Sequence, residues 1–185
     1  MHQQIGRHTW YDDLPSGQDK ARQQAYATWL KTFPWKVYLS LTFAYPVSHL
    51  AAQHQLAEFH NRLERLCGTP IGSLFVEETR SWSGCGLAAV PLHYHGLLCS
   101  DAPLDPGQIE TVWGSMGHFG GNAKADLYDP SGNAAFYCMK FLRYPDSHWE
   151  VAHLDFFMDY NGPNNHAARR RARRRAERNS RLCRN

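Results

Sequence analysis

Two histidines separated by a single residue, His93 and His95, are the side chains in this sequence best suited to hold a metal ion. They lie in a strand-like stretch, residues 88–99, and side chains two apart on a strand point to the same face. Both imidazoles therefore project from one side of a sheet, close enough to share one divalent cation. The simpler interpretation is a pair of histidines on a half-solvated strand face.

A carboxylate would complete this metal site, and Glu77 and Glu78 end the strand that precedes the histidines. Strand alternation favours Glu77, because Leu74 and Val76 then face the core helices. Glu78 remains the alternative ligand, since a β-bulge would exchange the two faces. Two imidazoles and one carboxylate leave coordination positions open, as catalysis on a phosphate requires. The simpler interpretation is that both glutamates are ordinary surface charges at a strand end.

A tyrosine and a lysine further along the chain, Tyr137 and Lys140, are spaced to share one face of a helix. A phenol hydroxyl beside an ammonium group is suited to attack a phosphodiester, because the cation stabilises phenolate or phosphate charge. Tyr144 lies two helical turns from Tyr137 on the same face and is the alternative nucleophile. Taken alone, the pair is also consistent with a structural role, in which Tyr137 is a buried ring and the aliphatic part of Lys140 packs on it.

The flanking sequence predicts the elements that carry these residues. Helices are predicted over residues 18–33, 48–67, 105–113 and 134–143, and strands over residues 36–43, 72–79, 88–99, 123–128 and 149–158. The predicted apolar faces of the first two helices comprise Ala21, Ala25, Trp29 and Leu30 or Phe33, and Leu56, Phe59, Leu63 and Leu66. Strands 72–79 and 88–99 should be antiparallel neighbours, because their connection is too short for a helical crossover.

The composition fits one globular domain with a basic tail. Of the 185 residues, 43% are hydrophobic, and no run is apolar and long enough to cross a membrane. We assign residues 1–165 to the domain, with an N-terminal helical extension, and residues 166–185 to the tail. The five scattered cysteines suggest reduced thiols and a cytoplasmic location.

The tail is the most strongly charged part of the chain. Residues 169–185 contain nine Arg and one Glu, a net charge of +8, whereas the whole chain carries +3, so residues 1–168 carry −5. A polyanion such as DNA is the natural partner of this tail. The tail residues expected to contact DNA are Arg169, Arg170, Arg171, Arg173, Arg174 and Arg175. A solubilising C-terminal helix is the simpler interpretation.

The order of three motifs resembles the HUH endonuclease superfamily, and most closely its small single-tyrosine initiators of rolling-circle replication. The motifs are a hydrophobic strand, Tyr38-Leu39-Ser40-Leu41-Thr42-Phe43, then His93-Tyr94-His95, then Tyr137-x-x-Lys140. The resemblance covers residues 36 to 144. It implies an α+β fold, in which an antiparallel sheet of about five strands carries helices on one face, related to the RNA-recognition fold.

The resemblance also implies a mechanism. His93, His95 and an acidic residue would hold Mg²⁺ or Mn²⁺, and Tyr137 would attack single-stranded DNA at an origin or hairpin, assisted by Lys140. The product would be a 5′-phosphotyrosine, and Tyr38, Ser40 and Thr42 would lie on the DNA-binding face. The chain lacks the Gly-x-x-x-x-Gly-Lys-[Ser/Thr] loop of viral Rep helicases, so a host helicase is the expected partner of this plasmid or viral enzyme.

Two other functions fit the same residues. A transposase or a mobilisation relaxase would use identical chemistry in another biological role. A non-catalytic module would bind single-stranded nucleic acid by stacking bases on aromatic rings such as Tyr38 or Tyr94, with the tail on phosphates.

Overall fold

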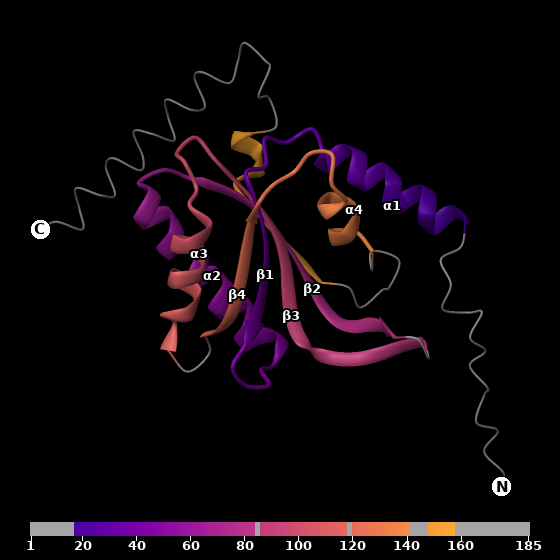
Figure 1. Cartoon of the computed structure of the whole chain (residues 1–185), viewed down its shortest axis with the longest axis horizontal. Helices are drawn as coiled ribbons and strands as arrows, with labels where there is room; N and C mark the ends of the chain where they lie inside the picture. The colour runs from indigo at the N-terminus through magenta and orange to yellow at the C-terminus, as the bar shows by residue number, and fades with distance from the viewer. Residues whose placement is uncertain (1–16, 84–85, 118–119, 141–147, 158–185) are drawn as a thin grey trace, which may run out of the picture.

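The computed structural model of the chain describes residues 17–83, 86–117, 120–140 and 148–157. The predicted Arg tail and Tyr144 lie outside the described residues. Within them, a five-stranded sheet stands between two layers of helices, with α2 and α3 on one side and α1 and α4 on the other (Figure 1). The α+β class and the antiparallel sheet are therefore confirmed.

The sheet has the strand order β4-β1-β3-β2-β5, and all four neighbouring pairs are antiparallel. The strands are β1 (Val37–Phe43), β2 (Ile71–Ser83), β3 (Gly86–Ser100), β4 (Gly120–Leu127) and β5 (Trp149–Ala152). The predicted pairing of the His strand with the strand before it is confirmed as β2 with β3. Both arms of this hairpin extend into the stretch that the sequence predicts as a loop, because their backbones continue to pair as far as Ser83 and Gly86.

One face of the sheet is covered by α2 (His49–Cys67) and α3 (Pro106–Gly114). Its core joins Val37, Leu39 and Leu41 of β1 to side chains of both helices. Local sequence signals fix the ends of these helices: the Ser48 side chain caps α2, Gly68 takes the left-handed conformation after it, and Asp105 caps α3. The expected burial of Leu66 was wrong, since this side chain is 53% exposed.

The opposite face carries a second core, which corrects the prediction of helices on one face only. Here α1 (Gly17–Leu30) and α4 (Ala134–Cys138) cover the second face of the sheet, and Leu74, Val76 and Leu97 are buried in this second core. The N-terminal helix is thus an integral layer of the domain. Its buried residues are Gln23, Ala27 and Leu30, whereas the predicted face through Ala21 and Ala25 is exposed.

Two elements near the C-terminal end are shorter than predicted. Helix α4 ends at Cys138, so Lys140 follows it in a turn, and residues 141–147 lie outside the described part. Strand β5 ends at Ala152, and the chain then forms the 3-10 turn η2 (Leu154–Phe156). Asn133 precedes α4, and its side chain makes no capping hydrogen bond.

We expect Trp113→Ala to be among the most destabilising single changes. The Trp113 ring is fully buried, packs edge-on against Phe43 and Phe59 at 5.4 and 5.2 Å, and donates its N–H to the Thr42 carbonyl. Its removal should lower the free energy of unfolding by about 3–5 kcal/mol, measured by urea denaturation. The matched control, Trp149→Ala on the edge strand, should cost less than about 1 kcal/mol; equal losses would contradict this core.

Candidate metal centre

The pairing of β2 with β3 brings one carboxylate to the two histidines. Glu78 lies directly opposite His93 in the register, and His95 lies two residues further along the same face. Glu78 Oε2 is 2.9 Å from His95 Nε2 and 3.5 Å from His93 Nε2. One ligand atom from each of the three side chains lies within 4.8 Å of the other two, close enough for a single ion.

The preference for Glu77 as third ligand was wrong. Glu77 pairs with Tyr94 and points to the opposite face, where its carboxylate contacts His49 Nδ1 and accepts a hydrogen bond from the Tyr94 hydroxyl. The prediction took Leu74 and Val76 as marking the α2 face, but both are buried on the α1 side. The pairing of β2 with β3 is regular from Ile71 to Glu78, so the alternative ligand, Glu78, faces the histidines without the β-bulge that was expected to be needed.

Hydrogen bonds to the Nδ1 atoms orient both imidazoles. His93 Nδ1 lies 2.9 Å from the Pro91 carbonyl, which can only accept, so Nδ1 carries a hydrogen and the neutral ring has its lone pair on Nε2. His95 Nδ1 lies 2.9 Å from both the Tyr38 and the Ser40 hydroxyls, and either can accept its hydrogen. Such bonds are how proteins fix the tautomer of metal-binding histidines.

Burial and charge set the protonation of the group. Burial alone would raise the pKa of Glu78, but the close approach of His93, His95 and Lys140 outweighs it and holds the pKa well below its usual range. The carboxylate is thus charged although it is only 2% exposed. Burial lowers the pKa of His95, whereas the neighbouring Glu78 carboxylate raises the pKa of His93.

The residues present fit a divalent cation. Two imidazole nitrogens and a carboxylate oxygen converge, and such mixed N and O sets bind Mn²⁺ and related ions. Glu78 Oε2 and His95 Nε2 are both buried, and neither makes a regular hydrogen bond to any described residue. Lys140 Nζ lies 2.7 Å from Glu78 Oε2, so its ammonium offsets the buried charge and competes with any ion.

The predicted nucleophile lies against this group. The Tyr137 ring centroid is 4.7 Å from that of His95, and Lys140 Nζ is 3.6 Å from the Tyr137 centroid. The Tyr137 side chain is 39% exposed, so a substrate can reach it. Helix α4 is positioned partly by α1, because Gln23 donates a side-chain hydrogen bond of 3.0 Å to the Phe136 carbonyl.

The strand residues that were predicted to contact DNA make hydrogen bonds within the protein instead. Tyr38 and Ser40 bond to His95, a supporting role that the sequence analysis missed although strand alternation already placed them on the histidine face. Thr42 is exposed and exchanges hydrogen bonds with the Asn122 backbone. Tyr94 is only 1% exposed, so it does not offer a surface for stacking bases. The six tail arginines lie outside the described residues.

Comparison with known protein families, with curated proteins and with solved structures finds no match to this chain. Among the described helices, none has both the length and the apolar composition needed to cross a membrane.

The two neighbouring glutamates provide a direct test of the centre. Glu78→Gln keeps the side-chain shape but removes the charge shared by the histidines, so Mn²⁺ affinity should fall by more than about tenfold. Glu77→Gln is the matched control on the opposite face and should leave Mn²⁺ affinity unchanged. Electron paramagnetic resonance of free Mn²⁺ measures both. A larger loss in Glu77→Gln than in Glu78→Gln would contradict this ligand assignment.

Proposed function

We propose that the chain is a metal-dependent endonuclease and strand transferase of the HUH type, acting on single-stranded DNA through a 5′-phosphotyrosine intermediate. One observation carries the proposal: Tyr137 and Lys140 lie directly against the group formed by Glu78, His93 and His95. Each pair alone fits a structural role, but a phenol, an ammonium and a three-ligand site in contact are the parts that this chemistry needs.

The metal would be held by Glu78 Oε2 and by the Nε2 atoms of His93 and His95. A bound Mg²⁺ or Mn²⁺ supplies Lewis-acid polarisation of a phosphate oxygen. Tyr38 and Ser40 keep His95 oriented from behind. Burial raises the pKa of Tyr38 to about 12, so its hydroxyl stays protonated and Tyr38 is a poor nucleophile.

In the proposed step the Tyr137 hydroxyl oxygen attacks the scissile phosphorus. A new bond joins this oxygen to phosphorus, the bond from phosphorus to the 3′ oxygen breaks, and the 3′ oxygen takes up a proton as tyrosine loses one. One phosphodiester replaces another, so the step is reversible and can rejoin strands. Lys140, beside both the ring and the carboxylate, stabilises the negative charge that develops.

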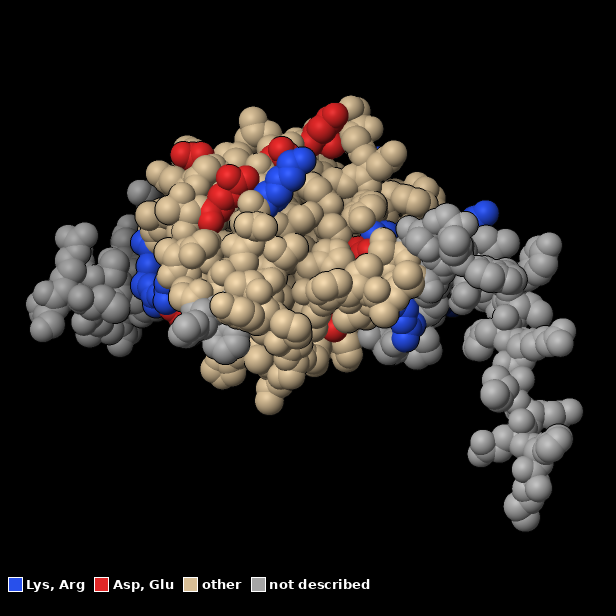
Figure 2. All heavy atoms as spheres, turned by 60° about the horizontal axis from the view of Figure 1, so that its bottom comes forward, with Lys and Arg blue, Asp and Glu red and all other residues tan. Residues whose placement is uncertain are grey.

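Within this chemistry we favour initiation of rolling-circle replication at an origin or hairpin, with a host helicase as partner. Transposition or mobilisation would use the same residues. On the face seen in Figure 2, Lys and Arg side chains of the described residues are scattered, and several lie beside Asp or Glu. The Arg-rich tail is therefore the strongest candidate for general contact with the phosphate backbone.

Tyr137→Phe separates the enzyme from a binding module. Phe keeps the ring and its packing on His95, so fold, metal binding and DNA binding should be retained. The covalent product, a denaturing-gel band of protein plus oligonucleotide formed with Mn²⁺, should be lost completely. Mass spectrometry of the wild-type adduct should place the nucleotide on the peptide that contains Tyr137.

The matched control is Tyr45→Phe, because Tyr45 is 65% exposed and belongs to neither the site nor α4. This variant should form the adduct at the wild-type rate. An adduct on Tyr144 would keep the chemistry but change the nucleophile. If the wild-type chain bound an oligonucleotide tightly and formed no adduct on any tyrosine, the endonuclease proposal would fail and the binding module would remain.

Removal of residues 169–185 should weaken DNA binding for all sequences alike. Each phosphate contact to single-stranded DNA contributes roughly 0.7 to the slope of log affinity against log salt, so the slope should flatten as arginines are lost. Fluorescence anisotropy at several NaCl concentrations measures it. Replacing the nine tail arginines with lysine keeps the charge and should keep the slope. An unchanged slope on deletion would show that the tail does not contact DNA.

A further inference from the structure

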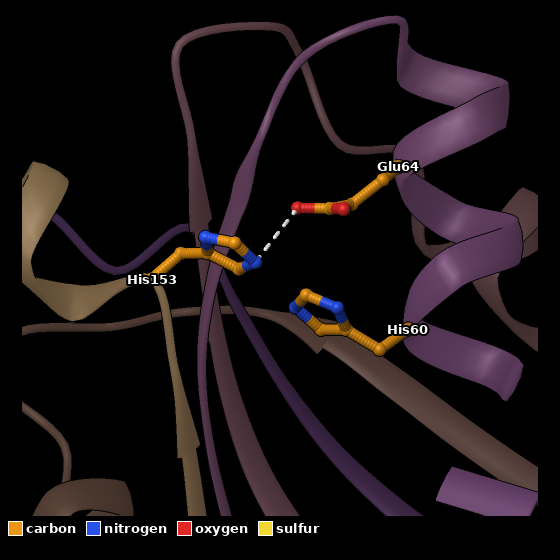
Figure 3. A group of neighbouring side chains, drawn as sticks. All are labelled: His60, Glu64 and His153. Carbon is orange, nitrogen blue, oxygen red and sulfur yellow. Dashed lines mark ion pairs between the residues drawn. The ribbon is translucent and has the colours of Figure 1, made fainter. Parts of the chain in front are cut away.

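A second group of metal-binding side chains lies away from the tyrosine site. His60 and Glu64 project from adjacent turns of α2. His153, the residue that precedes η2, points its side chain toward them (Figure 3). One ligand atom from each of the three lies within 4.8 Å of the others, and His153 Nε2 is 3.6 Å from Glu64 Oε1. The two imidazole rings are nearly parallel, with centroids 5.6 Å apart.

The backbone of Ile71 at the start of β2 orients two of these side chains. His60 Nε2 donates to the Ile71 carbonyl at 2.9 Å, and the Ile71 N–H donates to Glu64 Oε1 at 3.0 Å. These bonds fix the ring and the carboxylate before any ligand arrives, as outer hydrogen bonds do in metal sites. His60 is only 8% exposed, so its imidazole is held in place largely out of contact with solvent.

The backbone of His153 adopts an unusual conformation. Its φ of 53° makes it the one non-glycine residue with positive φ among the described residues. This conformation is sterically unfavourable for a residue with a Cβ, and glycine would adopt it without strain. Strained residues of this kind concentrate at functional sites, where the side chain contributes something that glycine cannot. Here the strained backbone directs an imidazole at Glu64 and His60.

We propose that His60, Glu64 and His153 form a second metal site, which takes Zn²⁺ or a similar first-row transition ion and has a structural role. Two histidines and a carboxylate are a common protein ligand set for Zn²⁺. The Glu64 and His153 side chains are 26% and 41% exposed, so water can complete the coordination. The ion would fasten the turn after β5 to α2.

The position of the site indicates which part of the fold a bound ion would stabilise. Strand β5 has only four residues and lies at the edge of the sheet, paired with β2 alone. Directly after His153, Leu154 and Phe157 enter the core on the α1 side. A metal bound by His153 would therefore hold the chain where it passes from the sheet edge into that core, and tie this segment to the helix on the opposite face.

The test uses the full chain stripped of metal by chelator, with His93→Ala and His95→Ala introduced to remove the first site. This parent protein should bind one Co²⁺, with the visible absorption of a low-coordinate site, and Zn²⁺ should raise its unfolding temperature. His153→Gly removes the ligand and relieves the strained φ. In this variant Zn²⁺ affinity should fall by more than about tenfold, without any drop in the metal-free unfolding temperature.

Two further variants complete the test. Glu64→Gln can still accept the Ile71 N–H, so it should fold and yet lose most of the Zn²⁺ affinity. His54→Ala removes an exposed histidine from the same helix and should change nothing. Equal Zn²⁺ affinity in the parent and in His153→Gly would overturn the proposal, as would a parent that binds no Co²⁺ or Zn²⁺. None of these outcomes depends on whether the chain cleaves DNA.

Discussion

The register between β2 and β3 is the constraint on which the candidate metal centre depends. Glu78 lies opposite His93, and because side chains alternate along a strand, all three potential ligands lie on one face. A slip of one residue would move Glu77 to the histidines and transfer every apolar side chain of β2 to the wrong core. The two buried cores on either side of β2 therefore select the register, and the register selects the ligand.

The second helical layer gives the site its electrostatic character. Because α1 and α4 cover this face, Glu78 is almost completely buried, and a buried carboxylate is stable as an anion only with close partners. Lys140 and the two histidines supply those partners. The same layer holds Tyr137 at the edge of the group, where its ring contacts His95 but remains accessible. Packing thus explains both the charge state of the centre and the position of its phenol.

The side chains of consecutive β2 residues point to opposite faces of the sheet. Glu78 faces the histidine pair, whereas Glu77 faces α2, where it contacts His49 and Tyr94. The His60, Glu64 and His153 group lies where α2 meets the edge of the sheet. Ionisable groups inside this small domain are therefore paired locally on each face, which is how a domain with polar residues within the sheet avoids isolated buried charges.

The sequence by itself determined what depends on local geometry. Alternation placed His93 and His95 on one face, Ser48 and Asp105 marked the starts of two helices, and the spacing of Tyr137 and Lys140 indicated that the two side chains lie together, although Lys140 lies in the turn after α4. Only the tertiary structure decided which glutamate joins the histidines. Alternation defines the two faces of a strand but does not say which face a helix covers, and here both are covered. The meeting of His153 with His60 and Glu64 likewise required the folded chain, because no periodic pattern links a turn to a helix so distant in sequence.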